Sequence, residues 1–208
     1  FVMKVCIIGD GLVSLALANV LIQKELMVDI ILSKKNSKYD KSRTLGISKS
    51  NIDYFNKEII NIEKILWEIK NIKIFTEKNF SEEILKFNNN NQQMFSIIKN
   101  YELQKLLNDN LKKSEFVKFK NITRYQNILK QEYKLIINCN PGHQITKKFF
   151  LNSINKNYNS YAYTTTINHK KVMNNNTAFQ NFTNNGPIAF LPISKTQTSV
   201  VYSLRSKY

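Results

Sequence analysis

Two glycines near the start of the chain have the spacing of a loop that binds phosphate groups. Gly9 and Gly11 follow an apolar run over residues 2–9 and stand just before a helical stretch that begins at Leu12. In such a loop the first glycine permits a tight turn, the second lets the backbone approach a pyrophosphate, and the first amides of the helix point at the anion. We therefore predict a dinucleotide site made by Gly9, Gly11 and the amides of Leu12 and Val13, with a plain structural turn as the alternative.

Two positions around the loop differ from the usual pattern. Ser14 stands at the third motif position, which usually holds glycine or alanine. The second strand ends at Ser33, where an Asp or Glu commonly holds the ribose hydroxyls. A serine can still hydrogen-bond a ribose there, although without the strength of a carboxylate. Lys34 or Lys35 would favour a phosphorylated ribose, as in NADP, unless both are simply solvated.

The segments that carry the loop predict an α/β fold with a Rossmann-like parallel sheet. A strand over residues 2–9, a helix from Leu12 and a strand over residues 28–32 form the start of a parallel βαβ unit. The apolar run over residues 133–139 has the composition of a further central strand.

Two more helices are predicted by capping residues followed by a periodic apolar face. Residues 50–53 resemble a capping box, and apolar residues then recur on one helical face as far as Leu66. Asn100 can cap the other helix, whose buried side carries leucines at 103, 106, 107 and 111.

The pattern changes at about residue 158, where successive side chains begin to alternate as they do in strands. Strands are predicted over residues 161–168, 177–183, 188–193 and 198–204. We therefore predict a nucleotide-binding domain over residues 1–157 and the start of a mainly antiparallel region over residues 158–208. Strands at 72–76 and 84–87, within the stretch of about 72–98, are expected to join the later sheet. Tyr161 and Tyr163 could line an aromatic pocket there, although tyrosines on such strands usually pack.

No side chain is assigned a catalytic role. Cys6 and Cys139 lie in apolar runs and form no CxxC pair, which predicts buried, reduced thiols and no metal site. His143 and His169 have no Ser, Cys or carboxylate partner at a recognisable spacing, so surface or satisfied histidines are expected.

The charge of the chain is strongly positive, with 31 Lys and Arg residues against 15 Asp and Glu residues, a net charge of +16. Only Arg43, Arg124 and Arg205 are arginines, whereas base readout and bidentate phosphate contacts favour the guanidinium group. We therefore predict no dedicated nucleic-acid site, while attraction to an anionic membrane surface stays open. No apolar run approaches the roughly 18 residues of a membrane-spanning helix, and the N-terminus lacks a leader pattern, so a cytoplasmic protein is expected.

Four stretches of the sequence together carry a family resemblance. They are residues 9–18, 43–48 and 100–107, and the run 177–183 with 186–193, in which a Phe-Thr pair is followed by the pattern GPxAxLP. These stretches resemble the FAD-dependent aromatic hydroxylases of ubiquinone biosynthesis, within the para-hydroxybenzoate hydroxylase superfamily. The last run is the most specific to the ubiquinone branch.

The resemblance implies a monooxygenase with FAD in the glycine-loop domain and an aromatic substrate beneath the antiparallel sheet. Arg43 matches the family arginine that lies along FAD. NAD(P)H would be the reductant, O2 the oxidant and a prenylated aromatic ring the substrate. The cofactor then performs the oxygen chemistry, which agrees with the lack of an obvious catalytic acid or base. A prenyl tail would place the substrate in a membrane, so peripheral contact with the inner membrane is plausible.

The chain also departs from the family. Asn140 replaces the aspartate of an Asp-Gly motif, Pro141 intrudes after it, and no Gly-Asp motif follows Gly186. We expect the chain to stop inside the substrate sheet, as a piece of a longer protein. Two alternatives therefore stay open: a degenerate, non-catalytic member that serves as a binding or assembly module, and an NAD(P)-dependent dehydrogenase with the same glycine loop.

Overall fold

The computed structural model describes residues 3–33, 41–77, 83–88, 93–150, 152, 154 and 156–205. The chain forms two compact units, each assembled from three separate segments. Unit 1 comprises residues 1–39, 56–61 and 103–155, and unit 2 comprises residues 40–55, 62–102 and 156–208. The division into domains near residue 157 stays a prediction. Lys34 and Lys35, for which a ribose contact is predicted, lie outside the described residues.

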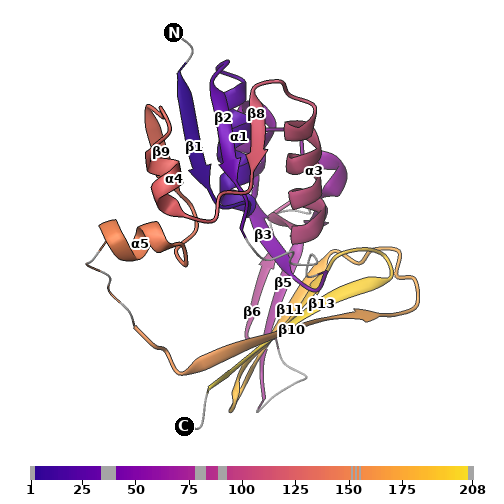
Figure 1. The fold of residues 1–208 in the computed structure, drawn as a ribbon. Coiled ribbons are helices and arrows are strands. Elements are labelled where there is room, and N and C mark those ends of the chain that lie inside the picture. Colours follow the sequence, from indigo (N-terminus) through magenta and orange to yellow (C-terminus); the bar gives the residue numbers. More distant parts are fainter. Residues whose placement is uncertain are drawn as a thin grey trace. The chain divides into compact units, whose positions relative to one another are not determined.

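Unit 1 is built on a parallel sheet in the order β8-β2-β1-β9 (Figure 1). Its strands are β1 (Lys4–Ile8), β2 (Met27–Ile31), β8 (Val117–Lys120) and β9 (Leu135–Asn138). The apolar residues of β1 and β2 are almost all buried, as expected for strands covered on both faces. Helix α1 (Leu12–Ile22) connects β1 to the parallel β2, and β9 lies on the other side of β1. The predicted βαβ start and the predicted third strand are thus confirmed.

Short helices complete the core of unit 1. Ile128 of α4 (Tyr125–Leu129) and Ile145 of α5 (Gln144–Phe149) form one buried cluster with Cys6, Ile8 and Ile31. None of the helices in the described ranges is both long and apolar enough to cross a membrane.

Helix α3 (Asn100–Lys112) buries Leu103, Leu107 and Leu111, three of the four leucines predicted on its buried side, while Leu106 is half-buried. The predicted cap of the helix was wrong. Asn100 is already the first helical residue, and its Oδ1 has no hydrogen-bond partner among the described residues. A side chain caps a helix only from the position before the first turn, which Lys99 occupies here.

Unit 2 contains a six-stranded sheet in the order β10-β13-β12-β11-β5-β6. Its strands are β5 (Asn71–Thr76), β6 (Leu85–Asn88), β10 (Ser160–Asn168), β11 (Thr177–Thr183), β12 (Gly186–Pro192) and β13 (Gln197–Arg205). All neighbours pair antiparallel except β11 and β5, which are parallel. The prediction of a mainly antiparallel sheet after residue 158 is confirmed, and the chain has the predicted α/β architecture of a parallel sheet with antiparallel sheets.

A smaller antiparallel sheet in unit 2 was not predicted. It has the order β3-β7-β4, from β3 (Thr44–Ser48), β7 (Phe95–Lys99) and β4 (Trp67–Ile69). Ile69 and Ile97 pack in one buried cluster with two residues from the six-stranded sheet. These are Ala178, near the start of β11, and Ile193, directly after β12. We call the side of the six-stranded sheet to which Ala178 belongs the Ala178 face, and the opposite side the Phe179 face, because neighbouring residues of a strand point to opposite faces.

The helix predicted to reach Leu66 is shorter than expected. Helix α2 (Lys49–Glu58) stops before the β-branched pair Ile59 and Ile60, and a single 3-10 turn follows at Glu63–Ile65. β-Branched residues and Asn are poor helix formers, so the apolar period alone was not sufficient to continue the helix. The cap also differs, because the Asn51 amide donates to Ser48 Oγ at 3.3 Å, which places the cap two residues before the predicted one.

Candidate functional site

The carboxyl ends of β1, β2 and β9 mark the place where unit 1 can bind a ligand. The chain leaves the central strand β1 toward β2 and β8 and later returns to its other side at β9, so the strand order switches at β1. Ligands of open parallel sheets bind outside the carboxyl ends of the strands at such a switch. Gly9 follows β1, Ser33 follows β2 and Asn140 follows β9, and these residues all line one cavity of about 240 Å³.

Gly9 is held in a conformation that only glycine adopts easily. Its φ is +109°, and its amide donates to the carbonyl of Ile31 at 2.9 Å, which ties the loop to the end of β2. A Cβ atom at this position would lie 3.3 Å from both Asn140 Cβ and Ser14 Oγ. The predicted role of Gly9 as the tight turn therefore has a clear physical basis.

Gly11 has space in front of it where a ligand could lie. It is the residue before the first turn of α1, and among the described residues nothing lies within 4 Å of a Cβ placed there. No side chain caps this helix end, and its first turn carries no acidic residue. The amides of Leu12 and Val13 belong to that first turn, where backbone N–H groups have no acceptor within the helix. The local geometry therefore fits an anion.

The third motif position is buried. Ser14 is fully buried, and its Oγ has no hydrogen-bond partner within the described part of the chain. Helix α3 supports the loop, since Gln104 Nε2 donates to the carbonyl of Asp10 at 3.3 Å. This contact was not foreseen, because Gln104 lies 94 residues away in the sequence.

Asn140 serves mainly to shape its own loop. Its Oδ1 accepts from the amide of Gly142 at 3.1 Å, and its Nδ2 lies 3.5 Å from Ser33 Oγ. The two positions at which the sequence lacks the usual carboxylates thus lie side by side. Among the described lining residues of this cavity there is no Asp, Glu, Lys or Arg. An anion bound here would be held by backbone amides and neutral side chains.

The ring of His143 is satisfied by a hydrogen bond, as predicted. It caps α5, since its Nδ1 accepts from the amide of Ile145 at 3.3 Å, and burial lowers its pKa. A neutral imidazole suits this acceptor role. The other histidine, His169, has its ring nitrogens 2.8 Å from the carbonyl of Lys170 and 3.0 Å from Thr198 Oγ1. Both rings are thus occupied by structural contacts.

The two cysteines differ more than predicted. Cys6 is fully buried, and burial, followed by the charge of Asp29, raises its pKa to about 12. Such a thiol is inert at neutral pH. Cys139, expected to be buried as well, is only partly so, because it lies just after β9 where the sheet ends. No group of three or more His, Cys, Asp or Glu residues in the described ranges could hold a metal ion.

A buried ionic cluster in unit 1 escaped the sequence analysis. Asp29, in the middle of β2 and only 2% exposed, accepts at Oδ2 from Lys4 Nζ at 3.1 Å, Lys120 Nζ at 2.8 Å and the Tyr133 hydroxyl at 2.7 Å. Burial raises the pKa of this carboxyl, but the hydrogen bonds from Lys120, Tyr133 and Lys4 outweigh it and hold the pKa below its usual value. The only sequence feature that could have indicated this cluster is the single Asp within the apolar run of β2.

Arg43, the remaining predicted site residue, belongs to unit 2. It is the residue before β3, and its carbonyl accepts from the amide of Asn100 at 3.0 Å. The glycine-loop residues all belong to unit 1. The association of Arg43 with their ligand stays a prediction.

Unit 2 has an apolar cavity of about 520 Å³ on its Phe179 face. Phe75, Phe179 and Phe190 line it, and the rings of Phe75 and Phe179 stack with centroids 6.4 Å apart. Its wall also contains Asn181, whose buried Oδ1 has no partner among the described residues. Tyr161 and Tyr163 share this face but are 62% and 60% exposed, and neither is part of the wall.

Comparison with known proteins gives matches in structure alone. No protein-family model and no curated protein matches the sequence. PqsL of Pseudomonas aeruginosa, a probable FAD-dependent monooxygenase, has a TM-score of 0.72 at 11% identity, over 99% of this chain and 61% of its own. HpxO of Klebsiella pneumoniae, solved with FAD and uric acid, has a TM-score of 0.74 at 13% identity, over 98% and 57%. CtdE, solved with FAD and a substrate, has a TM-score of 0.76 at 12% identity, over 99% and 58%.

The chain shares their fold. It spans only 57% to 61% of the length of these three solved chains. At identities of 11% to 13%, the similarity establishes the architecture alone and nothing about individual residues.

Proposed function

We propose that this chain is part of a FAD-dependent monooxygenase that hydroxylates a prenylated aromatic ring in ubiquinone biosynthesis, with NAD(P)H as reductant and O2 as oxidant. The observation that carries the proposal is the glycine loop at the strand switch, with an uncapped helix end and open space at Gly11. The shared fold favours FAD over other dinucleotides, because HpxO and CtdE hold FAD in their solved structures. The pathway and the prenylated substrate rest on the resemblance of the four sequence stretches.

The residues of unit 1 fit the ADP half of FAD. The pyrophosphate would lie before Gly11 and accept from the amides of Leu12 and Val13, where the helix end favours a negative charge by about 0.3 to 1 kcal/mol. Ser33 and Thr123 line the adjoining cavity and offer hydroxyl groups to a ribose. Arg43 would contribute toward the flavin half.

Unit 2 would hold the substrate. FAD, when bound, supplies the oxygen chemistry, and the protein binds and orients the reactants and keeps water away. Besides the apolar cavity on the Phe179 face, a polar cavity lies on the Ala178 face, and its wall includes Lys41 and Ser42, the two residues before Arg43. We assign the aromatic ring to the polar cavity, because the resemblance places Arg43 along FAD.

A non-catalytic binding or assembly module is the second candidate. The side-chain oxygen of Asn140 already accepts a hydrogen bond from the amide of Gly142. The described lining of the unit 1 cavity offers no carboxylate to a ribose. Both features weaken the hold on FAD. The dehydrogenase alternative lacks such support, since unit 2 is built on two mainly antiparallel sheets and not on a second parallel nucleotide-binding sheet.

The setting of the protein follows from the same proposal. We propose a cytoplasmic protein that meets its substrate at the inner membrane through lysines, and that has no nucleic-acid partner.

The reaction itself is tested with isotopically labelled O2, FAD, NAD(P)H and a phenol that carries an isoprenoid chain. Label in the product of the complete protein supports the proposal, whereas NAD(P)H oxidation without labelled product contradicts it. The 208-residue chain alone is expected to be nearly inactive.

A further inference from the structure

The acidic residues of the chain are confined to its first part. All 15 Asp and Glu residues lie before residue 133, whereas residues 133–208 contain nine Lys and Arg residues and no acidic side chain. Charge of one sign over such a length is typical of segments that contact an anionic partner. The lysines of this region therefore have no acidic neighbours along the chain.

Adjacent lysine pairs occur four times in the chain, and two of these pairs are followed directly by two large apolar residues. One is Lys-Lys-Phe-Phe over residues 147–150, at the end of helix α5. The other is Lys-Lys-Val-Met over residues 170–173, between β10 and β11. We call them the α5 tip and the β10–β11 tip. The first belongs to unit 1 and the second to unit 2.

The α5 tip extends from a helix that is anchored at its other end. Helix α5 follows β9, at the edge of the parallel sheet (Figure 1). Ile145 is buried in the core of unit 1, and Thr146 Oγ1 accepts from Asn138 Nδ2 at 2.7 Å. Beyond these residues all four side chains of the tip are exposed, with Phe149 at 55% and Phe150 at 62%. Two adjacent phenylalanines in this position indicate an interaction surface.

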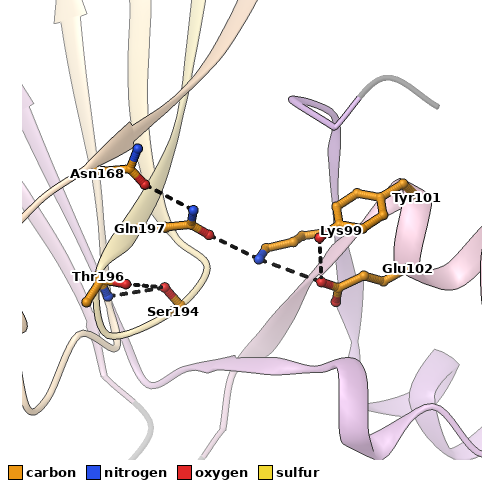
Figure 2. Close-up of polar contacts among 7 residues, drawn as sticks. All are labelled: Lys99, Tyr101, Glu102, Asn168, Ser194, Thr196 and Gln197. Atoms are coloured by element: carbon orange, nitrogen blue, oxygen red, sulfur yellow. Dashed lines mark hydrogen bonds and ion pairs between the residues drawn. The ribbon is translucent and has the colours of Figure 1, made fainter. Parts of the chain in front are cut away.

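The β10–β11 tip is held by the turn between β12 and β13. The Val172 amide donates to the carbonyl of Lys195 at 2.8 Å. That turn is itself fixed, because the Thr196 amide donates to Ser194 Oγ at 3.1 Å (Figure 2). The side chains of Val172 and Met173 are exposed nevertheless. Lys195 is also exposed, which places a third lysine beside this tip.

Exposed lysines beside exposed apolar side chains fit the interface of an anionic lipid bilayer. Each lysine near such a surface adds about fivefold to the affinity, and apolar side chains enter the boundary between headgroups and acyl chains. A nucleic acid would contact the lysines but leave the phenylalanines in water. A second copy of this chain would bring two net charges of +16 together. A bilayer satisfies both kinds of side chain.

We infer that the α5 tip and the β10–β11 tip are contacts for an anionic membrane surface. Their lysines lie at the lipid headgroups, and Phe149, Phe150 and Met173 insert below them. Each tip is a contact in its own right within its own unit. The identity of the substrate met at this membrane rests on the proposed function, whereas the docking itself requires neither FAD nor substrate.

The test is flotation of the 208-residue chain, without FAD, with vesicles of phosphatidylcholine alone and of phosphatidylcholine mixed with phosphatidylglycerol. We expect saturable binding to the mixed vesicles that weakens as salt rises, and at least roughly tenfold weaker binding to the neutral vesicles. Equal binding to both lipids, or no binding to the mixed vesicles, would overturn the inference.

Variants at the phenylalanines separate insertion from diffuse attraction by net charge. Phe149→Ser combined with Phe150→Ser leaves the charge unchanged and should weaken binding to the mixed vesicles about tenfold. Leu85→Ser combined with Phe87→Ser, at two exposed apolar residues of β6, is the matched control and should leave binding unchanged. Unchanged vesicle binding by the folded Phe149 and Phe150 variant contradicts the α5 tip, and loss of a dimer in that variant would assign the tip to a second copy instead.

Variants at the lysines locate the charge that matters. Lys147→Gln combined with Lys148→Gln should weaken binding to the mixed vesicles roughly tenfold or more. Lys112→Gln combined with Lys113→Gln makes the same change in net charge at an exposed pair that no apolar residue follows, and should have little effect. Equal losses from the two pairs, or a loss of DNA binding alone in the first, would overturn the inference.

Two further measurements complete the test. Phe150→Trp should be quenched by lipids with brominated acyl chains, unlike the wild type, whose only tryptophan is the half-buried Trp67. A vesicle-bound variant without quenching contradicts insertion. Val172→Ser combined with Met173→Ser should weaken binding at the β10–β11 tip, and unchanged binding removes that tip. Vesicle binding without FAD binding would retain the tips and reject the proposed function, and FAD binding without vesicle binding would do the reverse.

Discussion

Gly9 and Gly11 belong to one motif, but the structure gives them different constraints. A side chain at Gly9 must adopt a φ of +109° and meet Asn140 and Ser14, whereas Gly11 is extended at φ −78° with open space before it. Stability should therefore depend on the first glycine and ligand binding on the second.

We predict that Gly9→Ala lowers the free energy of unfolding by about 1 to 3 kcal/mol, because it forces a strained backbone. Gly11→Val should cost about 1 kcal/mol or less, through a poorer helix cap alone. Urea unfolding of both variants, with Gly46→Ala as a control whose Cβ would meet Phe95 only at an ordinary 3.6 Å, measures the difference. A larger loss at Gly11 than at Gly9 would show that the loop is not built as described.

The glycine loop could be predicted because its signal is local: two glycines, a strand before and a helix after. The contact of Asn140 with Ser33 could not, since the residues are 107 positions apart and meet only when β9 and β2 lie in one sheet. The same holds for Gln104 at the carbonyl of Asp10. Sequence reasoning found the motif and missed the side chains that support it.

At the level of elements, the buried carboxylate of Asp29 ties three strands together with charge. Its partners Lys4 and Lys120 stand on β1 and β8, on either side of β2. Removing the charge leaves two lysines and the Tyr133 hydroxyl around a neutral group. The parallel sheet should therefore lose stability when Asp29 is neutralised, by mutation or by acid.

We predict that Asp29→Asn lowers the free energy of unfolding at pH 7 by about 1 to 3 kcal/mol. The folded-state pKa of Asp29 lies below its value of about 3.9 in an unfolded chain, so its contribution is complete above that value and is lost as the pH falls below it. Urea titrations between neutral and acid pH should show a smaller acid loss in Asp29→Asn than in the exposed control Asp109→Asn. Parallel pH profiles for the two variants would refute this.

The strands β1 and β2 were predictable because continuous burial selects branched apolar residues. The strands β3, β4 and β7 were not, because all three are short. Strands β4 and β7 also depend on packing with the distant residue Ala178, through Ile69 and Ile97. Helix α2 was predicted to be longer than it is, because its apolar period continues past Glu58 in the sequence although the helix ends there. Periodicity records which residues are buried more reliably than where an element stops.

For the whole molecule, the net charge of +16 is a property of dispersed lysines. Non-specific attraction to polyanions should follow and should weaken steeply with salt. We predict that fluorescence anisotropy with a DNA duplex at physiological ionic strength detects no binding in the nanomolar range. Salt-resistant nanomolar binding would mean that a nucleic-acid site has been missed.

The affinity for FAD is the remaining whole-molecule expectation. The family resemblance implies two anchoring contacts that this sequence lacks, an aspartate at the position of Asn140 and a Gly-Asp motif after Gly186. Charge-assisted bonds contribute roughly 1.5 to 3 kcal/mol each, so binding should be about two to four powers of ten weaker than in a complete site. The purified chain should therefore be nearly colourless.

In the proposed function, the glycine loop of unit 1 holds the pyrophosphate of FAD. The most direct test is a titration of the wild-type chain and of Gly11→Val with FAD, followed by flavin fluorescence, after both proteins are shown to be folded. We predict weak but saturable binding by the wild type and none by Gly11→Val, because a branched side chain would fill the space that nothing occupies at Gly11. Equal binding by both proteins, or no binding by the wild type, would contradict the claim.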